Sequence, residues 1–177
     1  MNCKGLYNFF LLTLLVGFSS CSCSSEEPRE AIKPAASSVE AEALVEINRH
    51  LVEKEKDIVE TMIRSKGWEM NYHAEGYYSM LISGGEGKKI VDNSLVRIAC
   101  KVQLPDGTVC YDNQIRSFKV NSTVEIAGLH TGLLNRLEGD KLRFIFPPHM
   151  AYGLLGDQDK IPPRATLIFE VEVLNVD

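Results

Sequence analysis

Histidines and cysteines are the residues here that most often bind metals or attack substrates. The sequence has five cysteines and four histidines, His50, His73, His130 and His149. The histidines are scattered, and their spacing to cysteines and carboxylates matches no metal-ligand pattern. We therefore expect no metal site and no cofactor, and we interpret the histidines as solvated or structural.

Two cysteines, Cys100 and Cys110, flank the turn Pro105-Asp106-Gly107. In a two-residue hairpin they would lie on opposite faces. In a three-residue hairpin their Cβ atoms would be about 7 Å apart, against the ~3.8 Å that a disulfide needs. We interpret both as small buried hydrophobes. The glycine-rich segment 84–87 lacks a following lysine–serine pair or helix start, which argues against a phosphate-binding loop.

The N-terminus has the pattern of an export signal. Lys4 precedes an apolar run over 6–18, which is too short to span a bilayer comfortably. Ser19 and Ser20 then precede Cys21, as in a bacterial lipobox, so we predict a signal peptide over residues 1–20 and lipidation of Cys21. Cys23 is a second acceptor, and the alternative is an ordinary secretory signal. The expected location is the bacterial cell envelope, periplasm or outer membrane, with the chain held at the membrane by its lipid.

Composition shifts mark the next two segments. Residues 21–39 are rich in serine and proline and predict a flexible linker. Residues 40–67 predict a helix whose apolar positions recur at spacings of three, four and seven. This stripe would either pack on the following domain or form a surface for dimerisation or client binding, so a homodimer through residues 40–66 is one expectation.

From Trp68 to Asp177 the hydrophobic period changes to two. Short apolar runs at 77–82, 95–104, 117–120, 141–146 and 166–176 predict strands, and residues 128–137 predict a short helix. This pattern indicates an α+β domain over 68–177, with an antiparallel twisted sheet wrapped on one helix. The net charge of −5, without a basic cluster, argues against nucleic-acid binding.

Five motifs lie in order over the 71 residues from 104 to 174 of this domain. They are the segments 104–112 (LPDGTVCYD), 125–129 (EIAGL), 139–140 (GD), 147–153 (PPHMAYG) and 161–174 (IPPRATLIFEVEVL). Together they resemble the FKBP-type peptidyl-prolyl cis/trans isomerases. The layout of lipobox, helix and the Gly76-Tyr77-Tyr78 strand is similar to lipoprotein isomerases associated with bacterial gliding motility.

The resemblance implies catalysis of rotation about X-Pro bonds in proline-containing polypeptides, without a nucleophile, metal or cofactor. The residues implied to line a proline pocket are Tyr111, Phe118, Ile126, Leu129, Ile161 and Phe169. Tyr152 would offer its hydroxyl, the Ile126 N–H would hold a substrate carbonyl, and Asp112 would orient polar groups at the rim. The alternative is that the apolar residues of this set form the hydrophobic core of a sheet with a helix across it.

Four departures from the family pattern alter the expected site. Leu129 replaces a tryptophan at the pocket floor, which predicts weaker binding of macrolide inhibitors, and Cys100 replaces a tyrosine at the pocket edge. Glu125 replaces a valine whose contacts are peripheral in the family. Asp157 and Arg164 charge the rim differently. Two functions follow: a lipid-anchored isomerase that assists folding of exported proteins, or an FKBP-like chaperone or binding module with little turnover.

Overall fold

The helix α1 (Ser38–Lys66) is the first element of the computed structural model, which describes residues 38–122 and 124–177. It covers the segment where the sequence predicted a helix. The Gly67 N–H bonds to the Arg64 carbonyl and the Trp68 N–H to the Ile63 carbonyl, with Gly67 at φ 64°. This is a Schellman ending, which favours glycine at the left-handed position. The predicted signal peptide, Cys21 and most of the linker lie outside the described residues.

The apolar stripe of α1 is only partly used for packing. Near its C-terminal end, Val59 is buried against Tyr78, Ile145 and Ile168, and the Tyr78 hydroxyl donates to Glu60 at 3.1 Å. The earlier apolar side chains are exposed, and they are Leu44, Val45, Ile47, Leu51, Val52 and Ile58. Packing on the domain therefore accounts for one end of the stripe.

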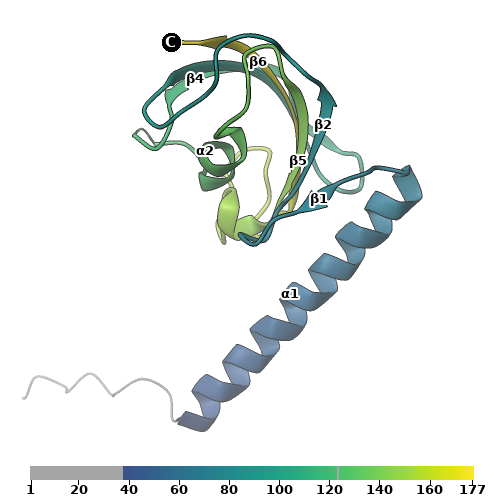
Figure 1. Ribbon diagram of the computed structural model, residues 1–177. Coiled ribbons are helices and arrows are strands. Elements are labelled where there is room, and N and C mark those ends of the chain that lie inside the picture. The colour runs from purple at the N-terminus through teal and green to yellow at the C-terminus, as the bar shows by residue number, and fades with distance from the viewer. Residues whose placement is uncertain (1–37, 123) are drawn as a thin grey trace, which may run out of the picture. The chain divides into compact units, whose positions relative to one another are not determined.

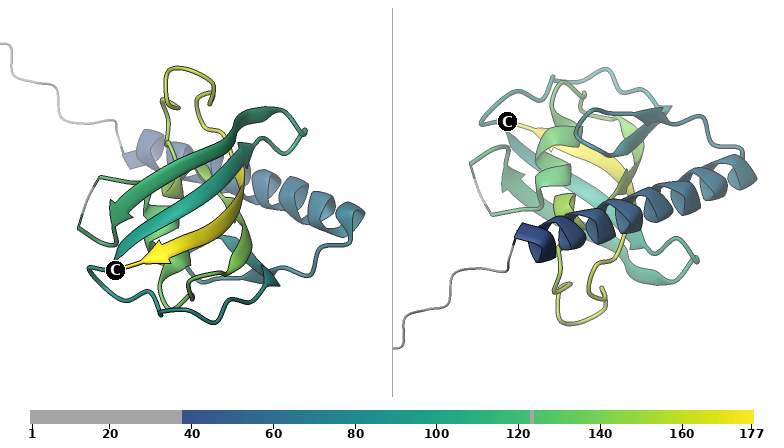
Figure 2. Two further views of the ribbon diagram at one scale, coloured as in Figure 1. Left: turned by 90° about the horizontal axis from the view of Figure 1, so that it is seen from above. Right: turned by 90° about the horizontal axis from the view of Figure 1, so that it is seen from below.

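Six strands form one antiparallel sheet in the order β1-β2-β5-β6-β3-β4. The strands are β1 (Asn71–Tyr72), β2 (Tyr78–Ser83), β3 (Leu95–Gln103), β4 (Val109–Lys119), β5 (Lys141–Phe146) and β6 (Leu167–Val176). The sheet curls, and the helix α2 (Ala127–Leu133) lies against its concave side (Figure 1). The left view of Figure 2 shows β4, β3 and β6 side by side, as their pairing requires. The α+β fold predicted from the sequence, with a sheet wrapped on one helix after an N-terminal helix, is confirmed.

The core lies between α2 and the sheet. Phe144 and Phe146 of β5 and Phe169 of β6 are fully buried there. A Cβ on Gly128 would lie 2.6 Å from a carbon of the Phe146 ring, and one on Gly132 would lie 2.9 Å from the Phe144 ring. Two glycines on one face of α2 therefore let the helix approach the aromatic rings closely.

Two of the predicted elements, α2 and β4, differ in length from the sequence prediction by more than one residue. The helix α2 ends at Leu133, not Leu137, because Leu134 is extended and Asn135 takes φ 65°. Asn135 then bonds with Ile90 instead of continuing the helix. The strand β4 begins at Val109 because its pairing with β3 begins there, opposite Gln103, and extends to Lys119 opposite Leu95.

A β-bulge interrupts β4 between Tyr111 and Gln114. Val102 pairs with Tyr111 and Cys100 with Gln114, so two steps along β3 match three along β4. Asn113 takes φ 50° within this extra step. Because a bulge shifts the alternation of faces by one residue, the side chains after it are placed differently from a regular strand.

Cys100 and Cys110 are buried free thiols, as expected from the hairpin geometry. Across residues 38–122 and 124–177, no helix combines the length and apolarity that crossing a membrane requires.

Candidate functional site

The apolar residues expected to form a pocket lie together beside α2. Six of them belong to the buried core cluster, and they are Cys100, Phe118, Ile126, Leu129, Ile161 and Phe169. Tyr111 and Tyr152 are partly buried and pack against the same cluster. Four elements supply these side chains: β3, β4, α2 with its preceding residue, and the segment from β5 through β6. The structure therefore brings together eight of the nine predicted site residues.

Asp112 does not join this group. It is exposed, and it borders a hollow together with Lys101, Glu170 and Glu172. The bulge explains this placement, since it leaves both Asp112 and Asn113 exposed between the partly buried Tyr111 and Gln114. The resemblance implied that Asp112 orients polar groups at the rim of the site, and the structure places its exposed carboxylate outside the group around Tyr152.

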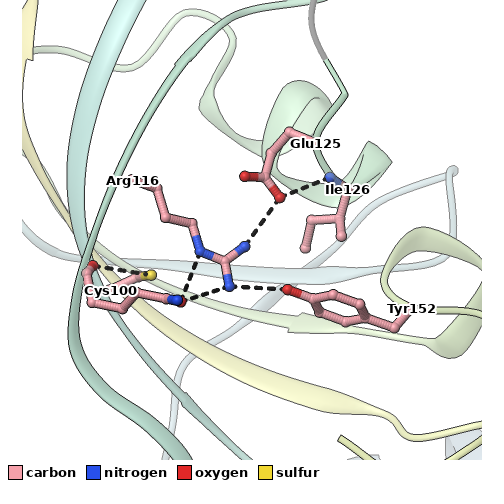
Figure 3. A network of polar contacts seen from close by, with 6 residues as sticks. Cys100, Arg116, Glu125, Ile126 and Tyr152 are labelled. Atoms are coloured by element: carbon pink, nitrogen blue, oxygen red, sulfur yellow. Dashed lines mark hydrogen bonds and ion pairs between the residues drawn. The ribbon is translucent and has the colours of Figure 1, made fainter. Parts of the chain in front are cut away.

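Arg116 of β4 takes the central polar position instead. Its Nη2 donates to the Tyr152 hydroxyl at 2.9 Å and to Gln114 Oε1 at 2.8 Å, and its Nε donates to the same Gln114 oxygen at 3.0 Å. Its guanidinium carbon lies 5.7 Å from the centre of the Phe169 ring. Figure 3 shows the guanidinium between Tyr152 and Glu125. The Arg116 cation therefore lies over the Phe169 ring, which belongs to the apolar group.

Glu125 is the charged partner of Arg116. Its Oε1 lies 3.0 Å from Arg116 Nη1, and the two side chains are only 15% and 11% exposed. The same oxygen accepts the Ile126 N–H at 2.9 Å (Figure 3). The resemblance places Glu125 where a valine makes peripheral contacts in the family. In this chain its carboxylate instead neutralises a buried cation and accepts the N–H that was expected to hold substrate.

Burial and charge act against each other in this network. Burial raises the pKa of Tyr152, and Arg116 only partly offsets that rise, so the hydroxyl stays protonated well above neutral pH. Burial alone would lower the pKa of Arg116, but Tyr152, Glu125 and Cys100 outweigh it, and the net pKa is raised. Burial also raises the pKa of the Cys100 thiol. The network therefore holds a permanent cation, and its thiol is not poised as a nucleophile.

Arg116 and Gln114 were not identified as site residues from the sequence, and Glu125 was named only as a departure from the family pattern. Arg116 stands two residues before the buried Phe118, so the period of a strand already places both on one face. Glu125 directly precedes Ile126 and carries the opposite charge. An inward-facing arginine and a nearby glutamate are signals that could have been read together, since a buried charge requires a partner.

The loop that carries Tyr152 is tied to β4 at a second point. The Tyr111 hydroxyl donates to Asp157 Oδ2 at 2.5 Å, and Asp157 Oδ1 accepts the N–H groups of Asp159 and Ile161 at 3.0 and 2.8 Å. Burial alone would raise the pKa of Asp157, but these hydrogen bonds outweigh it and lower the pKa. A lowered pKa in the folded protein means that ionised Asp157 stabilises the loop at pH values above about 4, and that this contribution is lost as pH falls below it.

Tyr111→Phe should loosen this loop without unfolding the domain. The variant removes the charge-assisted hydrogen bond to Asp157 and a longer contact to Asp159 Oδ2 at 3.3 Å. We therefore expect the amides of Asp159 and Ile161 to exchange with solvent about fivefold faster at pH 7. The pKa of Asp157 should rise toward its ordinary value. Hydrogen exchange and carboxyl titration by NMR measure both quantities, with Tyr72→Phe on β1 as the control. Unchanged exchange at Asp159 and Ile161 would show that the Tyr111 contact does not hold the loop.

Comparison with known proteins identifies the family. The family model for FKBP-type peptidyl-prolyl cis-trans isomerases matches residues 86–174, half of the chain. The chain belongs to the FKBP family. This FKBP chain is 28% identical over 160 residues to FkpA, an FKBP-type peptidyl-prolyl cis-trans isomerase of Escherichia coli, covering 86% of this chain and 57% of FkpA. The enzyme class expected from the motifs is thereby confirmed at the level of the family.

Two further relatives frame the question of activity. A peptidyl-prolyl cis-trans isomerase from Pseudomonas syringae pv. tomato has a similar crystal structure, with TM-score 0.60, 28% identity, and coverage of 73% of this chain and 95% of that one. The mouse protein FKBP6, named as an inactive peptidyl-prolyl cis-trans isomerase, is 30% identical over 105 residues, which are 56% of this chain and 32% of FKBP6. The FKBP chain spans about a third to a little over half of the length of FKBP6 and FkpA. The relatives therefore include proteins named as isomerases and one named as inactive, so turnover depends on the residues of the site.

Proposed function

We propose that this FKBP binds X-Pro segments at the apolar group beside α2 and catalyses their cis/trans isomerisation. The observation that supports this most is the meeting of Leu129, Ile161 and Phe169, all nearly or fully buried, with the Tyr152 hydroxyl and the Ile126 N–H. Apolar walls and two oriented hydrogen-bonding groups are what this reaction requires of a protein.

Rotation about an X-Pro bond breaks amide resonance, and the barrier is near ~20 kcal/mol. The twisted amide has less charge separation than the planar one, so an apolar, water-poor site stabilises it relative to the ground state. Phe169 and Leu129 would supply that environment. The Tyr152 hydroxyl and Ile126 N–H would hold the neighbouring carbonyls, and a ten-thousandfold acceleration would need about 5.4 kcal/mol of differential binding.

The present arrangement is closed to such a ligand. Ile126 N–H is bonded to Glu125, and the Tyr152 hydroxyl accepts a hydrogen from Arg116. We propose that substrate displaces the Glu125 carboxylate from Ile126 while Tyr152 keeps a hydroxyl hydrogen to donate. Each turnover then includes a local opening of the Arg116–Glu125 pair.

We place this activity at the cell envelope, on exported client proteins. The supporting pattern is the signal-like N-terminus with Cys21, whose lipidation would anchor the chain, as in the lipoprotein isomerases of gliding motility that the layout resembles. The exposed apolar side chains at one end of α1, such as Leu44 and Ile47, would serve a homodimer or bind clients.

A second function is favoured by the same closed network. If the Arg116–Glu125 pair opens too rarely, the domain would act as an FKBP-like chaperone or binding module with little turnover. The test is the rate of isomerisation of a proline tetrapeptide, together with the suppression of aggregation of a proline-free client. Isomerisation that falls about tenfold in kcat/KM in Tyr152→Phe, but not in the control Tyr72→Phe, supports the enzyme. Suppressed aggregation without acceleration supports the binding module.

A further inference from the structure

Arg116 places a buried positive charge inside the candidate site. Its side chain is 11% exposed, and four of its N–H···O contacts end on Gln114, Tyr152 and Glu125. Of these three partners, only Glu125 carries a negative charge. A buried cation without a counter-charge is strongly unfavourable, so the neutralisation of Arg116 depends on one carboxylate, Glu125.

The Glu125 carboxylate also accepts a second hydrogen bond, which a ligand must break. Glu125 Oε1 accepts hydrogen bonds from both Arg116 and the Ile126 N–H, at 3.0 and 2.9 Å. A ligand carbonyl that takes the Ile126 N–H therefore draws Glu125 away from the point where it also neutralises Arg116. Ligand binding and loss of the counter-charge are coupled through a single oxygen atom.

The ligand can supply the missing charge itself. The guanidinium reaches from Glu125, two residues before α2, to Tyr152 (Figure 3). Its carbon also lies 5.7 Å from the centre of the Phe169 ring. A carboxylate carried next to the proline would meet it where Glu125 does now, in the geometry that arginine favours for carboxylates. A neutral side chain would leave Arg116 without an anion, and a lysine would add a second cation.

We propose that Arg116 makes this site selective for polypeptide segments with an aspartate or glutamate flanking the proline, the substrate carboxylate replacing Glu125 on the guanidinium. The proposal rests on the proposed function for the location of the site, and it adds the class of substrate. It makes Arg116 a specificity-determining residue and Glu125 an internal competitor of the substrate.

The test compares the peptides Ala-Glu-Pro-Phe, Ala-Gln-Pro-Phe and Ala-Lys-Pro-Phe, with their Pro-Glu and Pro-Gln counterparts, by kcat/KM and by calorimetric Kd. With the wild-type protein we expect a glutamate peptide on at least one flank to exceed its glutamine counterpart about tenfold, the size of one charge-assisted hydrogen bond. Arg116→Met should abolish the preference. Glu125→Gln should enlarge it, because the internal competitor is gone.

The controls separate selectivity from folding and from the proposed function. Arg143→Met removes another arginine that is paired with a glutamate, Glu170 at 2.6 Å, and it should keep the preference. Circular dichroism establishes that each variant is folded, and Arg116→Lys, which retains the charge, stands in for Arg116→Met if that variant unfolds, with a reduced preference expected. Glutamate-selective binding without turnover would support this inference while the isomerase proposal fails. Turnover or binding with no glutamate preference on either flank, or no binding at all, would overturn it.

Discussion

Glu125→Leu is expected to lower the free energy of unfolding by about 3–5 kcal/mol, because it leaves the Arg116 guanidinium buried without a counter-charge. The two side chains of this pair are 11% and 15% exposed, so solvent screens the lost interaction only weakly. Urea denaturation followed by circular dichroism measures the change. The slope of the transition should stay constant if the native fold is retained.

Two further variants show whether charge is the cause. Arg116→Met combined with Glu125→Leu removes both charges and should recover most of the loss, since buried ion pairs can often be replaced by apolar residues of similar size. Glu172→Leu breaks the more exposed pair with Lys141 (3.3 Å) and should cost less than about 1 kcal/mol. A double variant as unstable as Glu125→Leu alone would contradict the explanation.

Gly85→Ala is expected to destabilise the domain by about 3 kcal/mol, the upper end of what overpacking costs. A Cβ at this position would lie 2.2 Å from the Glu138 carbonyl oxygen and 2.6 Å from the Asp140 nitrogen, and both belong to the backbone. The Gly85 N–H also donates to Asp140 Oδ1 at 2.7 Å, which holds the two segments together. Neither segment can move aside without losing that bond.

Gly84→Ala is the matched control one residue earlier in the chain. A Cβ there would meet nothing within 4 Å. We expect the free energy of unfolding of this variant to lie within about 0.5 kcal/mol of the wild-type value or slightly above it. The reason is that alanine restricts the unfolded chain more than glycine does. Equal stability of the Gly84 and Gly85 variants, measured by thermal unfolding, would contradict the close approach.

Hydrophobic periodicity predicted the α+β fold, and the apolar residues of the site came from the family resemblance that the local motifs carry. The motif over 161–174 predicts that Phe169 lies on a strand of the site. The motif over 125–129 predicts that Ile126 and Leu129 lie where the helix begins. The polar part depends on a bulge at Asp112–Asn113, where one extra residue decides which side chains face the core. No local signal in the sequence marks that bulge, so the exposed position of Asp112 outside the site was not predicted.

The packing of α1 shows a different limit. Its apolar stripe was visible in the sequence, but periodicity describes a face of a helix and not what covers it. Val59 is buried by Tyr78 and Ile145, whereas Leu44 and Ile47, on the same stripe, are exposed. Only tertiary structure separates these two parts of one pattern.

In the proposed function, proline segments bind beside α2, where Ile126, Arg116 and Tyr152 meet. NMR chemical shifts, recorded while a proline tetrapeptide is added to the protein, test it directly. We expect the largest changes at the Ile126 amide and the Arg116 Nε–H, with the ring signals of Tyr152 moving alongside them. A separate hollow is bordered by Val52, Tyr72 and His149. Shifts concentrated there, with Ile126 and Arg116 unmoved, would contradict the account.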